Sequence, residues 1–329
     1  MKTTTGFDVI KTEIAIKYIK DNFEKELAKA LKLIRVSAPL FVFPETGLND
    51  NLSGKERAVR FDISSLNREV EIVQSLAKWK RNALYEYGFS VGEGLYTDMN
   101  AIRRDEDNLD NLHSVYVDQW DWEKIIRRDQ RKLSYLKSTV KSIYKAFYKV
   151  ANLVEKKYPE LKNDFAKEIT FVSTKQLEKE YPNLTRKERE IAITKKHKAV
   201  FIYQIGWNLK DGKPHDTRAA DYDDWKLNGD IMIYDDVLDT AVEISSMGIR
   251  VDEESLVKQL KKKKELDKLS NAYCKGIIDK KLPLTIGGGI GQSRVCMLLL
   301  KKKHIGEVQA SVWSDKVVAE LKEQGITLL

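Results

Sequence analysis

Apolar residues recur at intervals of three to five positions along residues 8–31, which predicts a long amphipathic helix. Residues 33–40 follow as an extended stretch, in which Pro39 suits a strand end or a sheet edge because proline has no backbone N–H to donate. The chain therefore begins with a helix and then a short strand. The apolar face of the helix is predicted to comprise Ile10, Ile14, Tyr18, Phe23, Leu27 and Leu31.

Short apolar or alternating segments farther along predict the strands of a sheet. Residues 130–200 are rich in lysine and glutamate and mostly helical in pattern, so we expect a helical connection there that packs on the sheet and carries no chemistry. Long helical crossovers do not alternate with the strands, as a parallel sheet requires, so a mainly antiparallel α+β fold is expected. The predicted strands are 70–73, a segment starting at 92, 114–123, 199–206, 241–251 and a short one leading into the glycines near 287.

The strand predicted at 114–123 carries polar residues among aromatic ones. Side chains alternate between the two faces of a strand, so Gln119 and Asp121 share one face, while Asp118, Trp120 and Trp122 share the other. One face of this strand can therefore contribute two polar groups to a common pocket.

Glycines at alternate positions 287, 289 and 291 follow a short apolar strand, and an apolar helix begins three residues after the last of them. A backbone without Cβ atoms can approach a flat ring or a phosphate, and a helix N-terminus favours an anion. Arg294 lies one turn into that helix. The stretch matches neither G-x-G-x-x-G nor the Walker pattern, so a buried strand-to-helix turn remains the structural alternative.

Acidic residues are concentrated in two other places. Four carboxylates lie within nine residues, at positions 216, 221, 223 and 224, and such crowding requires a metal ion, basic partners or open water. Glu243 stands among apolar residues of a predicted strand, and we expect it to pair with Arg250, with Arg294 or with a magnesium ion.

Composition limits the class of protein. The 329 residues are 42% hydrophobic and 33% charged, which is typical of a globular protein, and one large domain or two smaller ones are both possible. There is no apolar run of about 18 residues and no apolar signal core, so a cytoplasmic protein without a membrane span is expected. The net charge of +8 could indicate nucleic acid, but the basic runs are mixed with acids or helical in pattern, which favours solvated faces. The four histidines are far apart, which argues against structural zinc.

Three of these features resemble, in order, the signature motifs of class II aminoacyl-tRNA synthetases. The helix at 8–31 with the Pro39 strand resembles the first motif, which forms the homodimer interface in that superfamily. Two strands joined by a charged loop, with Arg103 at the end of the first, resemble the second. Gly-x-Gly-x-Gly-x-x-Arg at 287–294 resembles the third.

Further matches narrow the resemblance to ammonia-dependent asparagine synthetases (aspartate–ammonia ligases), relatives of the catalytic core of aspartyl- and asparaginyl-tRNA synthetases. The similarity covers nearly the whole chain and implies a single catalytic domain over 1–329. Arg104 and Ala220 replace prolines that are frequent in the family, which concerns loop stiffness and not the chemistry. The matching stretches are 49–54, 75–81, 92–97, 113–123, 221–225, 227–230, 243–251 and 285–294.

The resemblance implies that ATP activates the β-carboxylate of L-aspartate as an adenylate, which ammonia converts into L-asparagine with release of AMP and pyrophosphate. Arg103 and Arg294 would bind phosphate oxygens and act as catalytic groups. Mg²⁺ would be held near Glu243, with Asp230 a further ligand. The nucleotide-binding set implied in this way is Arg103, His113, Asp230, Glu243, Ser246, Arg250, Gly287, Gly289, Gly291 and Arg294.

The amino acid would lie beside the nucleotide. Lys80 and Ser75 would bind carboxylate oxygens, while Asp50, Gln119 and Asp121 would bind the α-ammonium, and Arg294 would contact both substrates. Ammonium must lose a proton before it can attack, and Asp50 is the first candidate base, with Asp223 the second.

A synthetase that uses glutamine needs a glutaminase cysteine, commonly the residue exposed when Met1 is removed. Position 2 is lysine here, and neither Cys274 nor Cys296 has a histidine nearby in the sequence. Free ammonia is therefore the expected nitrogen donor. The alternative is an aspartyl- or asparaginyl-tRNA synthetase-like paralogue. The first motif begins near residue 8, which leaves no space for an N-terminal anticodon-binding barrel, so no nucleic-acid partner is expected. A catalytically inactive paralogue is a second alternative, but such proteins usually lose the arginines and the glutamate that Arg103, Arg294 and Glu243 supply here.

Overall fold

The structure is a computed structural model that describes residues 6–50, 52, 56–106 and 109–329. Its centre is an eight-stranded sheet whose strands lie in the order β1-β5-β6-β11-β10-β9-β8-β7. Only the outer pairs β1–β5 and β7–β8 are parallel, so the predicted mainly antiparallel α+β fold is confirmed. The strands are β1 (Leu33–Arg35), β5 (Gly94–Ile102), β6 (Tyr116–Ile125), β7 (Thr170–Ser173), β8 (Ala199–Tyr203), β9 (Asp223–Asp235), β10 (Thr240–Arg250) and β11 (Thr285–Gly291).

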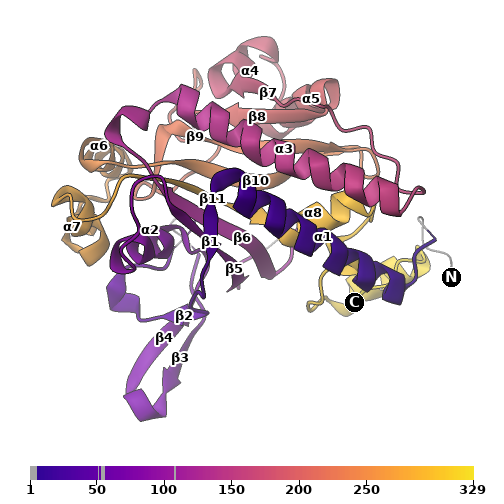
Figure 1. Cartoon of the computed structure of the whole chain (residues 1–329), viewed down its shortest axis with the longest axis horizontal. Coiled ribbons are helices and arrows are strands. Elements are labelled where there is room, and N and C mark those ends of the chain that lie inside the picture. The colour runs from indigo at the N-terminus through magenta and orange to yellow at the C-terminus, as the bar shows by residue number, and fades with distance from the viewer. Residues whose placement is uncertain (1–5, 51, 53–55, 107–108) are drawn as a thin grey trace.

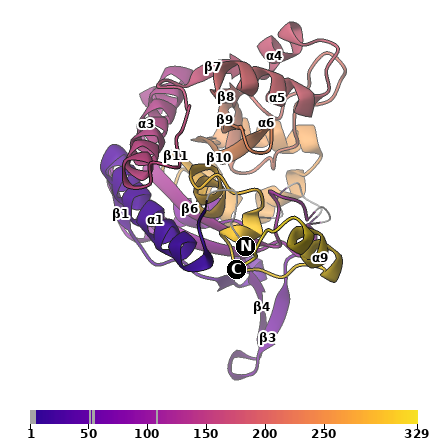
Figure 2. The ribbon, with the colours of Figure 1, turned by 90° about the vertical axis from the view of Figure 1, so that its right-hand side faces the viewer.

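Helices cover both faces of this sheet. The long helices α1 (Val9–Leu31) and α3 (Leu133–Lys157) run side by side over one face, and α8 (Gln292–Leu299) joins them (Figures 1 and 2). Trp120, Trp122 and Phe201 point to that face and form the largest apolar core with the helices. The remaining helices are α2 (Ala77–Glu86), α4 (Thr174–Glu180), α5 (Arg186–His197), α6 (Glu253–Lys263), α7 (Ala272–Ile278) and α9 (Asp315–Glu323), with short 3₁₀ helices at Pro44–Thr46, Ser64–Leu66, Arg128–Gln130, Leu266–Ser270 and Ile305–Glu307.

On the opposite face of the sheet, the described helices cover the two edges more than the middle. Leu84 of α2 packs with Leu95 near one edge, and Ile193 of α5 packs with Ile202 near the other. Between these two small cores lie the middle strands β6, β11, β10 and β9, whose side chains on this face are largely polar. The middle of this face is therefore polar and lies between two apolar clusters, and we call it the polar floor of the sheet.

A small second sheet projects from the body of the molecule. Its strands β2 (Phe41–Val42), β4 (Arg68–Ile72) and β3 (Arg60–Ile63) are antiparallel, and the β3–β4 hairpin extends away from the main sheet (Figure 1). The segment of 33–40 is less regular than expected, because β1 ends at Arg35 and Pro39 belongs to no strand.

The bounds of the first helix are confirmed, but part of its predicted apolar face is wrong. Asp8 caps the helix by accepting a hydrogen bond from the Lys11 backbone N–H. Ile10 and Ile14 are 69% and 57% exposed, and Ala15, Ile16 and Ile19 are buried in their place with Phe23, Leu27 and Leu31. Spacing alone could not decide between two overlapping apolar stripes on one helix.

One expectation about the middle of the chain also changes. Residues 130–200 are not wholly helical, because Thr170–Ser173 forms the edge strand β7 between α3 and α4. The strand β9 begins at Asp223, so two of the four crowded carboxylates, Asp223 and Asp224, lie in the sheet. Within the described residues, no helix is long and apolar enough to cross a lipid bilayer.

Candidate active site

A cavity of about 330 Å³ lies on the polar floor of the sheet. It is bordered by α2, by the segment around Asp50 and by the ends of β5 and β6. The geometry therefore gathers most of the predicted site residues, which are far apart in sequence, around one space. Those that line it are Asp50, Ser75, Lys80, Arg103, His113, Gln119, Asp121, Asp223, Glu243, Ser246, Arg250, Gly289, Gly291 and Arg294.

The glycines of β11 make room for neighbouring side chains. Gly289 pairs with Asp121 in the sheet, and a Cβ at Gly289 would lie 2.3 Å from Gln119 Oε1. Gly287 pairs with Glu123, whose Oε2 would be 1.8 Å from a Cβ at Gly287. Gly287 does not line the cavity, so the structure supports a packing role at this position in place of the predicted contact with nucleotide.

Arg294 is fixed at the start of α8. Its side chain lines the cavity, and its Nη1 donates a 2.9 Å hydrogen bond to the backbone carbonyl of Glu243 on β10. The atoms nearest to a Cβ at Gly291 would be Arg294 side-chain carbons, at 3.4 Å and beyond, so the turn into α8 is not crowded. The predicted link between Arg294 and Glu243 therefore exists, but through the backbone carbonyl.

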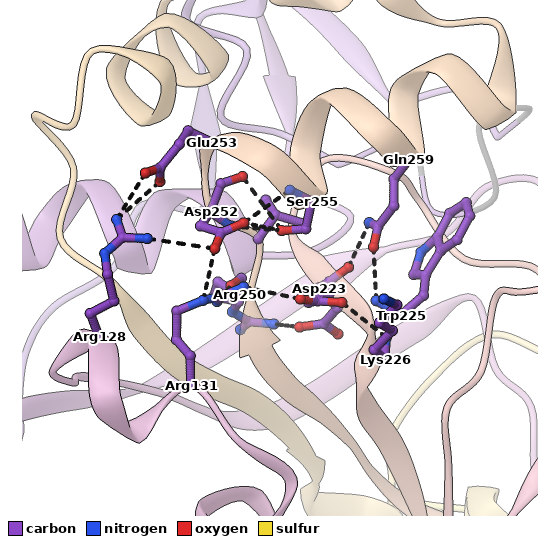
Figure 3. A network of polar contacts seen from close by, with 12 residues as sticks. Arg128, Arg131, Asp223, Trp225, Lys226, Arg250, Asp252, Glu253, Ser255 and Gln259 are labelled. Carbon is purple, nitrogen blue, oxygen red and sulfur yellow. Dashed lines mark hydrogen bonds and ion pairs between the residues drawn. The ribbon is translucent and has the colours of Figure 1, made fainter.

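Arg250 was one of three partners expected for Glu243, and the described residues show no ion pair between the two. Arg250 instead contacts Glu123, with its Nε and Nη2 at 2.9 and 2.7 Å from the carboxylate oxygens, and its Nη1 donates to Asp223 (Figure 3). Arg250 and Glu123 are at most 2% exposed. Two carboxylates surround this guanidinium, so its first effect is to hold β6, β10 and β9 together beneath the cavity.

A second ion pair lies in the wall contributed by α2. Lys80 Nζ is 2.8 Å from Asp121 Oδ2 and donates to the Gly288 carbonyl at 2.9 Å. Both residues are buried, and burial lowers the pKa of Lys80 although Asp121 opposes the shift. Lys80, which was expected to bind a substrate carboxylate, and Asp121, which was expected to bind the α-ammonium, thus neutralise each other.

Asp50 lines the cavity as a buried carboxylate. Its Oδ1 accepts from the Leu52 backbone N–H at 3.0 Å, while Oδ2 has no hydrogen-bond partner within the described residues. Burial raises the pKa of Asp50 to about 6, and Lys78 opposes the shift while Asp221 adds to it. A carboxylate with this pKa is ionised at neutral pH and can still accept a proton.

Asp223, the second predicted base, has a different environment. Burial also raises its pKa, but Arg250 opposes the shift by ion pairing with Oδ1. Because that ion pair occupies one oxygen of Asp223, the geometry ranks Asp50 ahead of it.

A second cavity of about 300 Å³ adjoins the first, and both are lined by Leu52, Arg103, Glu106, Tyr222, Glu243 and Ser246. Arg218 lines only the second cavity and forms an ion pair with Asp230. Asp230 lines neither cavity. The geometry therefore does not support the direct contact between Asp230 and nucleotide that the resemblance implied.

The carboxylates of Glu243 and Asp230 could bind Mg²⁺ if phosphate oxygens and water supplied the remaining ligands. Burial raises the pKa of Asp230 to about 7, Arg218 opposes the shift and the nearby Glu243 adds to it. Asp230 Oδ1 is buried without a hydrogen-bond partner in the described part of the chain. No group of three or more metal-ligating side chains exists among the described residues. One or two carboxylates completed by phosphate oxygens and water are a common arrangement for Mg²⁺.

The four crowded carboxylates are satisfied by basic partners. Asp221 pairs with Lys78, and Asp224 pairs with Arg131. Asp223 pairs with Arg250, and Arg131 also contacts Asp252 (Figure 3). Asp216 pairs with Arg218. Of the three possibilities that the sequence left open, basic partners are what the structure provides.

Several residues at the site were missed by sequence reasoning. Glu123 could have been found, because it shares a strand face with Gln119 and Asp121. Lys78 is one of three basic residues at 78–81, but its partner Asp221 is 143 positions away. Tyr222 lies in the matching stretch 221–225, but neither it nor Arg218 was assigned a role, and both line the second cavity.

The remaining predicted residues lie at the margins of the site. His113 is about a third exposed and its Nδ1 is 2.7 Å from Asp110 Oδ1. Ser75 Oγ accepts from the Ala77 backbone N–H at 3.1 Å, at the start of α2. Ser246 pairs in the sheet with Gly289 on one side and with Asp230 on the other.

Comparison with known proteins matches this arrangement to one family. The family model described as aspartate–ammonia ligase matches residues 10–325. An aspartate–ammonia ligase of Ruminiclostridium cellulolyticum is 59% identical over 98% of this chain and 96% of its own length, and one of Fusobacterium nucleatum is 55% identical over the full length of both. Among solved structures, asparaginyl-tRNA synthetase from Pyrococcus horikoshii, complexed with asparaginyl-adenylate, has a TM-score of 0.66 at 14% identity, covering 92% of this chain and 70% of that one, which shows a shared fold. The predicted family and the class II synthetase-like fold are therefore confirmed, and this chain belongs to the aspartate–ammonia ligase family.

Proposed function

We propose that this chain joins ammonia to the β-carboxylate of L-aspartate at the expense of ATP, and releases L-asparagine, AMP and pyrophosphate. The observation that carries the proposal is the convergence of Arg103 and Arg294 with Lys80, Gln119 and Asp50 on one cavity. Two arginines suit phosphate oxygens, and the remaining polar groups suit a small zwitterion. Family membership supports the same activity.

The first step would be attack of a β-carboxylate oxygen on the α-phosphorus of ATP, with pyrophosphate as the leaving group. Arg103 and Arg294 would neutralise the charge that develops on the phosphoryl oxygens. Lys80 would exchange part of its contact with Asp121 for the substrate carboxylate, and Asp121 and Gln119 would then be available to the α-ammonium. Such an exchange keeps every buried charge paired before and after binding.

In the second step ammonia attacks the β-carbonyl carbon, the C–N bond forms and the bond to AMP breaks. Asp50 would remove the proton that ammonium must lose before it can attack. Mg²⁺ bound by Glu243 and Asp230 would supply charge neutralisation for the phosphates.

We also propose that the active form is a homodimer. The exposed apolar residues Ile10, Ile14 and Ile34 lie on α1 and β1, the elements that resemble the first class II motif. Sedimentation equilibrium should give twice the chain mass. A cytoplasmic location and the absence of a nucleic-acid partner stay predictions from the sequence.

The direct test separates the two steps. With the purified protein, pyrophosphate should exchange into ATP only when aspartate is present, and ammonia should then yield asparagine without tRNA. Charging of tRNA with aspartate, without asparagine synthesis, would instead support the synthetase alternative. Absence of aspartate-dependent exchange would contradict both.

A further inference from the structure

A third cavity of about 210 Å³ adjoins the active-site cavity at Asp50 and Leu52, which line both. Asp221 and Lys78 line it as well, whereas they do not line the active-site cavity. We name this space the side chamber. Its other described lining residues are Pro44, Gly47, Asn49, Arg60, Glu71, Ala219, Glu265, Lys268 and Asn271.

The charges of the side chamber leave one carboxylate unmatched. Arg60 Nε is 3.2 Å from Glu71 Oε2, and Lys268 Nζ is 2.8 Å from Glu265 Oε2. Lys78 Nζ is 3.1 Å from Asp221 Oδ2. Among the described lining residues, Asp50 is the carboxylate that has no ion pair, and it lies where the side chamber meets the active-site cavity.

Two carboxylate oxygens of the side chamber are also buried without hydrogen bonds. Asp50 and Asp221 are 2% and 1% exposed, and Asp50 Oδ2 and Asp221 Oδ1 have no partner within the described residues. Leaving charged acceptors unsatisfied in the interior costs free energy, so such atoms indicate a ligand that donates hydrogen bonds. The two residues also interact electrostatically with each other and with Lys78.

Building on the proposed function, we propose that the side chamber is the entry and capture site for the ammonium ion. Ammonium is a compact cation that only donates hydrogen bonds, so it matches two buried carboxylate oxygens that only accept them. The cation would be held by Asp221 and Asp50 and delivered past Asp50 to the β-carbonyl carbon. Asp221 is thus a substrate-binding residue, and Lys78 is a positioning residue that fixes one oxygen of Asp221 and leaves the other free.

The proton balance of this route is complete. Ammonium gives one proton to Asp50 and becomes ammonia, whose lone pair forms the C–N bond. The adduct nitrogen then carries a positive charge and loses a second proton, and AMP leaves with the electrons of the broken C–O bond. Two protons and one AMP dianion are released for each amide, and carboxylates that can relay protons, Glu71 and Glu265, also line the side chamber.

The test compares nucleophiles that differ in charge. Asp221→Asn should raise the KM for ammonium by about tenfold or more, since a charge-assisted contact is lost. Aspartate-dependent pyrophosphate exchange should stay within about threefold of wild type. Hydroxylamine is neutral at neutral pH and needs no capture as a cation, so formation of the hydroxamate should also stay within about threefold.

Controls separate this role from a structural one. Asp235→Asn changes another buried carboxylate, which lines none of the three cavities, and should leave all three measurements unchanged. If Asp221→Asn fails to fold because it leaves Lys78 unpaired, the double variant Lys78→Met/Asp221→Asn removes both charges and should show the same selective loss.

An unchanged ammonium KM, or equal losses with ammonium and hydroxylamine, would overturn the proposal. A wild-type protein without aspartate-dependent exchange would contradict the proposed function itself, so the two failures are distinguishable.

Discussion

Arg250 and Glu123 form a buried ion pair across an intervening strand, because Gly287, the partner of Glu123 on that strand, has no side chain. Arg250 belongs to β10 and Glu123 to β6, and both strands pair with β11. Arg250 Nη2 is 2.7 Å from Glu123 Oε2, which occupies the space that a Cβ at Gly287 would need. One glycine of the motif therefore serves the charge network that supports the cavity floor.

Removing the guanidinium should destabilise the whole protein. Arg250→Met leaves Glu123 and Asp223 buried without a countercharge, and we expect the free energy of unfolding to fall by about 3–5 kcal/mol. Chemical denaturation measures this change. Arg186→Met, which breaks the more exposed pair with Asp211, should cost no more than about 1 kcal/mol. If both variants lost a similar free energy of unfolding, the ion pairs of Arg250 would not be stabilised by burial as the structure indicates.

Adding one methyl group at Gly289 should disturb aspartate binding. The Cβ of Gly289→Ala would lie 2.3 Å from Gln119 Oε1 and 2.7 Å from Asp121 Oδ1, so both side chains must move. We expect the KM for aspartate to rise by about tenfold or more, because small displacements of positioning groups have large effects. Gly276→Ala in α7 is the control: this glycine lines none of the three cavities, and its Cβ would meet Leu282 side-chain carbons at 3.0 Å and beyond, so the KM for aspartate should change little.

Replacing the candidate base should affect the two half-reactions differently. Asp50→Asn keeps the size of the side chain but cannot accept the proton of ammonium, so amide formation should fall by about 10²–10⁴-fold. Aspartate-dependent pyrophosphate exchange, which needs no such proton transfer, should fall far less. Rapid-quench assays with preformed adenylate separate the steps, and Asp62→Asn on the exposed β3 strand serves as the control. Amide formation at the wild-type rate would exclude Asp50 as the base.

The raised pKa of Asp50 predicts two pH dependences. The amidation rate should fall as pH drops through about 6, because protonated Asp50 cannot act as a base. The native state holds this proton more tightly than the unfolded chain, whose pKa stays near 3.8, so ionisation of Asp50 reduces stability as pH rises from about 4 to about 6.

Asp50→Asn should therefore gain stability relative to wild type across that interval and keep the gain above it. Urea titrations of both proteins at pH 4.5 and 7, both conditions being approximate, measure the difference. A constant difference between the two proteins would show that the pKa of Asp50 is not raised.

Local sequence patterns determined much of the architecture. The bounds of α1, the fully buried strand β8 and the antiparallel character of the sheet follow from apolar spacing and from the lack of alternating crossovers. Alternation along β6 placed Gln119 and Asp121 on one face correctly, because the side-chain period of a strand is two wherever the strand lies. The ordered motifs identified the family, since their order does not depend on the details of packing.

The tertiary structure alone decided which charges meet. Arg250 was one of three partners expected for Glu243, yet it pairs with Glu123, which is 127 positions away. Lys78 reaches Asp221 across 143 positions. Similarly, Ile14 and Ile16 both fit an apolar helix stripe, and the packing of α1 on α3 and the sheet selects Ile16. Spacing within an element is fixed by local backbone geometry, but a partner for a buried charge is fixed by which distant strands become neighbours, and no single stretch of the sequence contains that information.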